Sequence, residues 1–135
     1  MNAPAGTRLA VGIGCRRGTS ADAIEHAVRA ALGARAFGDI AIVASIDVKR
    51  HEAGLLAFCE RHRLPLRFFS ADQIERAPRT ATSHHAAKHV QVSGVCEPCA
   101  LLAGSAEALI APKTIDGDVT VAIAAARGPF SNGTR

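Results

Sequence analysis

The sequence predicts a single-domain three-layer α/β/α sandwich around a mixed, mainly parallel sheet of about five strands. Short apolar runs alternate with segments of helical periodicity, which is the pattern of β–α–β units. The last two apolar runs flank Asp116-Gly117-Asp118, a turn sequence that favours an antiparallel hairpin. The 135 residues, 48% of them hydrophobic, are enough for one core, and with five Phe and no Trp or Tyr this core must be mainly aliphatic.

The first strand and the first helix follow from apolar spacing. Residues 9–13 form a short apolar run next to glycine, which predicts a buried strand. A helix then begins at Thr19 or Ser20, because Asp22 suits the positive end of a helix dipole and apolar residues recur at helical intervals over 24–32.

Two more strands and two helices are predicted in the middle of the chain. Residues 40–46 are apolar on both alternating faces, as expected for a strand covered on both sides of a sheet. Residues 52–62 predict a helix, and residues 66–69 predict a third strand. The sequence of residues 70–73, Ser-Ala-Asp-Gln, matches a capping box, which predicts a short helix to about Arg76.

The last part of the chain predicts a loop, a helix and a hairpin. Residues 79–94 are polar and rich in His, which indicates a loop with a short helical turn. Residues 97–103 predict a helix closed by Gly104 in the left-handed conformation. Residues 109–111 and 119–123 predict an antiparallel pair of strands.

The domain is expected over residues 1–126, and residues 127–135, which contain Gly, Pro and Asn, predict a flexible tail. The formal net charge of +4 favours anionic partners, and the scarcity of aromatic residues argues against nucleic-acid binding. We expect a cytoplasmic protein without a membrane span, because no apolar run is long enough to cross a bilayer and no export signal is visible. The four cysteines are then thiols.

The most specific motif is the glycine-rich stretch of residues 12–20 between the first strand and the first helix. Glycines allow a sharp turn and close approach of an anion, a helix start offers unpaired N–H groups, and arginine forks bind carboxylates. The stretch therefore predicts an anion cradle, against the alternative of a tight turn with solvated arginines. Its candidate ligand-binding residues are Gly12, Gly14, Cys15, Arg16, Arg17, Gly18 and Thr19.

Polar residues after the other strands are further candidates, because ligands bind beyond the carboxyl ends of strands in open α/β sheets. They are Asp47, Lys49 and Glu52 after the second strand, Ser70 after the third and Lys113 after the fourth. The alternative for Asp47 and Lys49 is that they cap and solvate a turn.

The cysteines and histidines permit other chemistry. Cys15 is the best-placed nucleophile, because Arg16 and a helix start would favour its thiolate, but no general base is evident, and Cys15 can equally be a small residue in a crowded turn. Cys96 and Cys99 have the spacing of a redox pair but lie late in the chain. With His85 and His89 they would make an unusual zinc framework, so we expect no metal and no cofactor.

Linked motifs from residue 9 to residue 126 resemble one family. They are Gly12–Gly18, Ile46–Lys49 with Glu52–Leu55, Leu64–Ser70, Ser93–Glu97, Ile110–Lys113 and Val119–Ala124. Together they resemble the cobalamin-biosynthesis proteins CobE and the C-terminal domain of CbiG. Pro98, Cys99, His84, His85 and His89 depart from the pattern expected for that family.

The resemblance implies an α/β/α domain in the corrin-ring branch of vitamin B12 synthesis. The longer CbiG proteins open a δ-lactone on a cobalt-precorrin and release acetaldehyde. This chain is without their extra N-terminal region and looks like the stand-alone CobE of the aerobic pathway. The partner implied is a precorrin-type tetrapyrrole, edged with acetate and propionate groups, and other corrin-pathway enzymes are further candidate partners.

Two functional hypotheses follow. In the first, the protein binds or carries a precorrin: Arg16, Arg17, Lys49 and Lys113 contact its carboxylates, Gly12, Gly14 and Gly18 shape the loop, and Asp47, Glu97 and Ser70 orient it. In the second, it is a hydrolase acting on a lactone-bearing precorrin, with Cys15, Asp47 or Glu97 as catalytic candidates. The absence of an evident base in the sequence favours binding.

Overall fold

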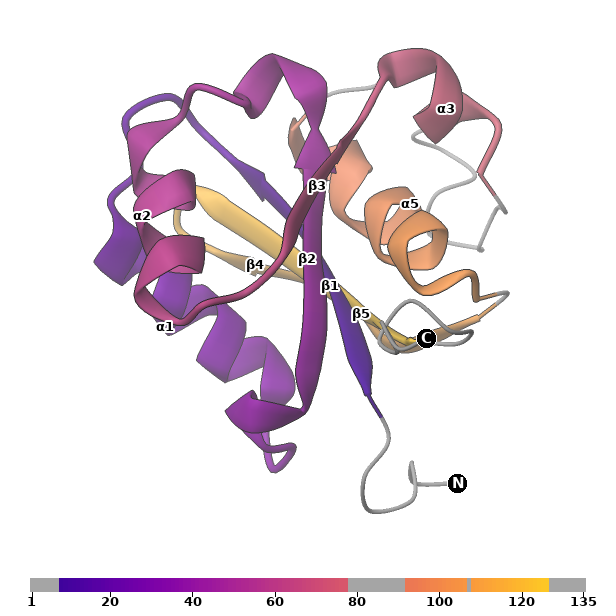
Figure 1. Cartoon of the computed structure of the whole chain (residues 1–135), viewed down its shortest axis with the longest axis horizontal. Helices are drawn as coiled ribbons and strands as arrows, with labels where there is room; N and C mark the ends of the chain where they lie inside the picture. Colours follow the sequence, from indigo (N-terminus) through magenta and orange to yellow (C-terminus); the bar gives the residue numbers. More distant parts are fainter. Residues whose placement is uncertain (1–7, 78–91, 107, 127–135) are drawn as a thin grey trace.

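A mixed sheet lies at the centre of the computed structural model, which describes residues 8–77, 92–106 and 108–126. Helices cover both faces of this sheet (Figure 1). The elements are β1 (Leu9–Cys15), α1 (Ala21–Leu32), the 3-10 turn η1 (Phe37–Asp39), β2 (Ile40–Ile46), the 3-10 turn η2 (Asp47–Lys49), α2 (Ala53–Arg61), β3 (Leu66–Phe69), α3 (Ala71–Glu75), α5 (Val92–Gly104), β4 (Leu109–Asp116) and β5 (Val119–Ala125). The predicted fold class is confirmed.

The described strands form one five-stranded sheet in the order β3-β2-β1-β5-β4. β1, β2 and β3 are parallel, whereas β5 is antiparallel to both β1 and β4. β4 therefore runs in the same direction as β1, and the carboxyl ends of β1 to β4 lie together with the β4–β5 turn. We call this end of the molecule the carboxyl rim and define it by residues 15–20, 47–52, Ser70 and 116–118.

Each face of the sheet packs against different helices. Alternate residues of β1, namely Leu9, Val11, Ile13 and Cys15, belong to the core under α1 and α2. The other face packs against α5, whose Val95, Cys99 and Ala103 share a core with Ala10 of β1. This alternation places the Cys15 side chain on the α1 and α2 face, because successive strand side chains point to opposite sides.

Gly12 determines how closely α5 approaches the sheet. A Cβ atom added at Gly12 would overlap the carbonyl oxygen of Cys96, and it would lie 2.7 Å from the backbone nitrogen of Ala100. The helix backbone thus rests directly on β1. Gly12 was expected to shape the anion-binding loop, but in the structure it lies inside β1 and makes room for α5.

Several predicted bounds agree with the structure and others need correction. The strands 40–46 and 66–69, the Ser70 capping box and the antiparallel β4–β5 pair are confirmed. The helix predicted over 97–103 begins at Val92 and contains Pro98, because its apolar side chains pack on the sheet on both sides of the proline. The predicted loop residues 79–91 and the tail 127–135 lie outside the described residues.

Gly104 does not adopt the predicted left-handed conformation. The residue with positive φ is its neighbour Ser105, with φ 53°. Gly104 is the last residue of α5, and a Cβ there would lie 2.5 Å from the carbonyl oxygen of Ala125. Its small size is required by packing against β5, which sequence spacing did not show.

The first and fourth strands are longer than predicted. β1 continues to Cys15 and β4 continues to Asp116. Lys113 therefore lies within β4 instead of following it. In the described part of the chain, no helix has the length and apolar character needed to cross a bilayer.

Candidate functional site

The β1–α1 loop is a tight, exposed turn at the carboxyl rim. Gly18 has φ +82°, a conformation that favours glycine. The backbone N–H and the hydroxyl of Thr19 donate to the carbonyl oxygen of Arg16 at 3.2 and 2.7 Å. Ser20 caps α1, because its Oγ accepts a hydrogen bond from the backbone of Ala23 at 3.0 Å. These hydrogen bonds fix the backbone of the loop, and the side chains of Arg16 and Arg17 are exposed to solvent.

Most amide groups of this loop already have acceptors within the protein. The Gly18 N–H donates to Oε1 of Glu52 at 3.0 Å, and the Arg16 N–H donates to the carbonyl oxygen of Asp118 at 3.1 Å. The sequence predicted backbone N–H groups open to an anion. In the structure, the Glu52 carboxylate already accepts the hydrogen bond from the Gly18 N–H. The cationic side chains are consequently the main donors left for a ligand.

The two arginines of the loop differ in their partners. The Arg16 guanidinium lies 3.3 Å from the Asp118 carboxylate, with both side chains more than half exposed, so this ion pair is weakly held. The Arg17 side chain is exposed and has no hydrogen-bond or ion-pair partner among the described residues. Arg17 is therefore the more available of the two for an anion.

The η2 turn lies beside this loop and brings three predicted residues to it. Glu52 follows the turn and accepts the hydrogen bond from the Gly18 N–H. Gly54 packs directly against the loop, because a Cβ at this position would overlap the carbonyl oxygen of Thr19. Lys49 is close enough for its charge to act on the thiol of Cys15. Between these polar groups Val48 is 72% exposed. Asp47 is half-buried at the start of the turn, and its carbonyl oxygen accepts from Arg50.

Cys15 is buried beneath the rim. Its exposure is 0%, and burial raises the pKa of its thiol; the Lys49 charge acts in the opposite direction and Glu52 in the same direction. The uncharged thiol is thus favoured over the thiolate that nucleophilic chemistry needs. The structure places Cys15 at the end of β1, in the core under α1 and α2, and not in the turn itself.

Glu97 and Lys113 lie together but apart from Cys15. The β4–β5 register is irregular between Ala111 and Thr114, so the Lys113 N–H leaves the strand ladder and donates to Oε2 of Glu97 at 2.9 Å. Glu97 is 3% exposed on α5, on the opposite face of the sheet from Cys15. The structure therefore separates this pair from the β1–α1 loop.

Ser70 lies at the rim but two strands away from β1. It follows β3, and β2 stands between β3 and β1. Its hydroxyl accepts from the Gln73 backbone at 3.1 Å, while its own N–H donates to Oε1 of Gln73 at 2.9 Å. The hydroxyl is used to start α3. Gly14 lies within β1 opposite Thr120, one residue before the rim begins.

A cleft at the rim brings together His26 and Asp116, which no sequence motif had indicated. Its volume is about 510 Å³, and Nδ1 of His26 on α1 lies 2.6 Å from Oδ2 of Asp116 at the end of β4. The cleft is lined by Gly18, Thr19, Ser20, Ala23, His26, Asp116, Gly117 and Asp118. His26 and Asp116 are 90 positions apart, so no local pattern could have paired them.

The other cysteines are buried in the core. Burial raises the pKa of Cys96 to about 12 and also raises the pKa of Cys99, which opposes redox chemistry at this pair. No cluster of three or more His, Cys, Asp or Glu side chains suited to a metal occurs among the described residues. His84, His85 and His89 lie outside the described residues.

Sequence comparisons give consistent matches. The family model for the cobalamin synthesis G C-terminus matches residues 9–124. Protein CobE of Sinorhizobium sp is 34% identical over 125 residues, which cover 89% of this chain and 81% of that protein. A cobalt-precorrin-5A hydrolase of Priestia megaterium is 30% identical over 118 residues, which cover 86% of this chain and 32% of that protein. The chain thus spans about a third of the hydrolase.

Solved structures share this fold. The cobalamin biosynthesis protein chiG from Agrobacterium tumefaciens str. C58 has a TM-score of 0.67 at 37% identity, over 89% of this chain and 99% of that one. CobE, from the cobalamin (vitamin B12) biosynthetic pathway, has a TM-score of 0.69 at 28% identity, over 91% and 93% of the two chains.

Proposed function

This chain belongs to the cobalamin synthesis G C-terminus family, and from that premise we propose that it binds a precorrin-type tetrapyrrole at the carboxyl rim. Precorrins are macrocycles with acetate and propionate groups at their edge and apolar ring faces. A site for such a ligand needs cations spaced along a rim and an apolar surface between them. The aerobic branch is part of what we propose, and its support is the likeness to protein CobE, which is 34% identical over 125 residues.

The observation that carries the proposal is the joining of the β1–α1 loop to the η2 turn through the Gly18–Glu52 hydrogen bond. It places Arg17 and Lys49, with the exposed Val48, on neighbouring loops of one rim. Arginine and lysine hydrogen bonds to carboxylates contribute on the order of 1.5–3 kcal/mol each where water is excluded. Val48 supplies an apolar contact for a ring face.

The acidic groups of the rim restrict how the ligand can lie. Asp116 and Asp118 line the cleft beside α1 and would repel carboxylates. Arg16 is held on that side by its pair with Asp118. The ligand's acidic edge is therefore expected over Arg17 and Lys49, and Arg16 joins it after leaving Asp118.

A charge-reversal experiment tests this proposal. Arg16→Glu together with Arg17→Glu is expected to weaken precorrin binding at least about a hundredfold, followed by the shift in the ligand's absorption spectrum. The control, Arg35→Glu with Arg76→Glu, changes the net charge equally outside the β1–α1 loop and the η2 turn. Equal affinity of the two double variants would remove the β1–α1 loop from the site, provided that circular dichroism shows both to be folded.

The second candidate function is hydrolysis of a lactone-bearing precorrin, and the His26–Asp116 contact favours it. In this reaction a water oxygen bonds to the lactone carbonyl carbon, His26 accepts the water proton, and the ring C–O bond breaks as its oxygen takes a proton. Asp116 orients the imidazole. Asp47 stays a catalytic candidate at the rim, whereas Cys15 and Glu97 are buried on opposite faces of the sheet.

Incubation with the lactone intermediate separates the two functions. Gain of one water or release of acetaldehyde, detected by mass spectrometry, identifies a hydrolase, and a spectral shift without turnover identifies a binding protein. If turnover occurs, His26→Gln is expected to lower kcat about a hundredfold or more while precorrin binding persists. A variant with unchanged kcat would exclude His26 as the base.

A further inference from the structure

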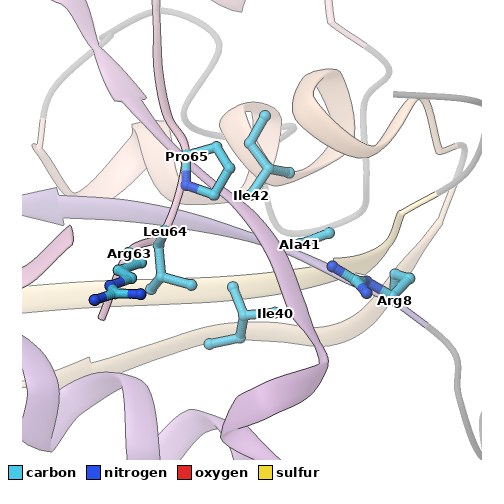
Figure 2. A pocket seen from close by; sticks show the side chains of 7 residues that line it. All are labelled: Arg8, Ile40, Ala41, Ile42, Arg63, Leu64 and Pro65. Atoms are coloured by element: carbon cyan, nitrogen blue, oxygen red, sulfur yellow. The ribbon is translucent and has the colours of Figure 1, made fainter. Parts of the chain in front are cut away.

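A second pocket lies at the end of the sheet opposite the carboxyl rim. Its volume is about 410 Å³, and it is formed where β1 and β2 begin and where the chain approaches β3. We call it the amino-end pocket; it is lined by Arg8, Ile40, Ala41, Ile42, Arg63, Leu64 and Pro65 (Figure 2). The volume lies within the range of small-molecule sites, roughly 300–1,000 Å³.

The walls of the amino-end pocket are apolar and its polar groups are cationic. Figure 2 shows Ile40 and Leu64 between the side chains of Arg8 and Arg63. Neither guanidinium has a carboxylate partner among the described residues, whereas Arg16, Arg29, Arg61 and Arg76 all do. Two unpaired arginines beside apolar side chains are complementary to an anion with an apolar body.

Arg63 is held in a conformation that an arginine rarely adopts. Its φ is 56°, in the left-handed region, where it follows the end of α2. The Leu64 N–H donates to the carbonyl oxygen of Cys59 at 2.8 Å, and the Arg63 N–H donates to that of Glu60 at 3.1 Å. These bonds make the helix-terminal motif in which glycine is the preferred residue. Arginine at this position therefore has a local conformational cost, and such costs occur at functional sites.

We propose that the amino-end pocket binds a small organic anion, whose acidic group contacts Arg63 and whose apolar body packs on Leu64, Ile40 and Pro65, with the charge of Arg8 on the other side of the pocket. This site is independent of the precorrin proposal, because it uses none of the rim residues and lies at the other end of the strands. Arginine forks donate to the oxygens of carboxylates and phosphates in the same bidentate way, so both acidic groups belong to the predicted ligand class.

The test uses anilinonaphthalene sulfonate, a fluorescent probe with one anionic group on an apolar body. Titration of the full chain is expected to give saturable fluorescence, and methyl NMR signals of Ile40, Ile42 and Leu64 are expected to shift. Arg63→Gly should weaken probe binding at least about fivefold, and Arg8→Gln should weaken it by a smaller factor, because Arg8 acts on the anionic group only through its charge across the pocket. Because glycine suits the left-handed position, Arg63→Gly is also expected to unfold at the same or a higher temperature.

Matched controls keep the outcome decisive. Arg76→Gln removes the same charge from the exposed Arg76–Asp72 pair on α3 and should bind the probe as the unchanged chain does. N-phenylnaphthylamine, which is without the sulfonate, should bind at least about fivefold more weakly. The proposal is overturned if Arg63→Gly binds the probe normally, if the neutral probe binds equally well, or if the shifted methyl signals lie at the carboxyl rim.

Discussion

Glu25 shows how a single carboxylate can join two helices on the outer layer of the fold. It lies on α1 and contacts His62 at 2.9 Å and Arg61 at 3.0 Å, both near the end of α2, as well as Arg29 at 3.0 Å on its own helix. The hydrogen bond from His62, followed by those from Arg29 and Arg61, lowers the pKa of Glu25 to about 2. Its negative charge is therefore stabilised by folding.

This lowered pKa predicts an acid-sensitive contribution to stability. Because the folded pKa of about 2 lies below the ordinary value of 4.5, the contribution is full above pH 4.5 and is lost as pH falls towards 2. Glu25→Gln is expected to reduce the free energy of unfolding by about 1 kcal/mol at pH 6, and by progressively less in acid. Urea unfolding of both proteins between pH 6 and pH 2 measures this difference.

The control for Glu25 is Asp72→Asn, which breaks the exposed i,i+4 pair with Arg76. Its effect should stay within about 0.5 kcal/mol at every pH. A difference between Glu25→Gln and the unchanged chain that does not vary with pH would contradict the assigned charge interactions.

At the scale of elements, the close packing of α5 on the sheet depends on glycines, which have no side chain. The backbone of α5 contacts Gly12 at Cys96 and Ala100, and β5 contacts Gly104 at Ala125, where a Cβ atom would leave no room. Small residues on the sheet, including Ala10, Ala44, Ala122 and Ala124, continue this surface. The helix can therefore pack close to three neighbouring strands, which compensates for the scarcity of large aromatic side chains in the core.

Gly12→Ala tests this close packing. The added methyl group would overlap backbone atoms of α5, which cannot move without shifting the whole helix, so a loss of at least about 2 kcal/mol in the free energy of unfolding is expected. Gly38→Ala is the control, because a Cβ there meets nothing within 4 Å and φ is not positive. Chemical denaturation measures both; equal stability of the two variants would mean that α5 lies further from β1.

At the scale of the whole molecule, all four cysteines are enclosed by the three layers. Cys15, Cys59, Cys96 and Cys99 are free thiols, none more than 4% exposed. Burial raises the pKa of each, to about 12 for Cys59. Reaction with a thiol reagent should thus require the layers to open.

This enclosure predicts slow thiol modification in the native protein. Labelling with Ellman's reagent at pH 8 is expected to be at least about a hundredfold slower in buffer than in denaturant, where all the thiols react. Val48→Cys is the positive control, because the Val48 position is 72% exposed and should react at once. Rapid labelling of Cys15 in the native state would show that the β1–α1 loop opens.

Much of the fold was predictable because its signals are local. The strand 40–46, the capping box at Ser70 and the β4–β5 hairpin each depend on residues close in sequence. The end of β4 and the start of α5 were misjudged, since packing on the sheet extends both beyond a local boundary. At the rim, the exposed Arg17 was foreseen, but the Glu52–Gly18 and His26–Asp116 contacts join distant positions.

The amino-acid sequence by itself determined the order and type of the elements, the exposed glycine turn and the family, because periodicity, turn chemistry and linked motifs are written along the chain. Only the tertiary structure decided that Glu52 accepts the hydrogen bond from the Gly18 N–H and that Glu97 and Cys15 lie on opposite faces of the sheet. It also decided that Arg8 and Arg63 line the same pocket. The physical reason is that side-chain partners, burial and the resulting pKa shifts depend on three-dimensional neighbours, and sheet pairing brings these together from remote segments.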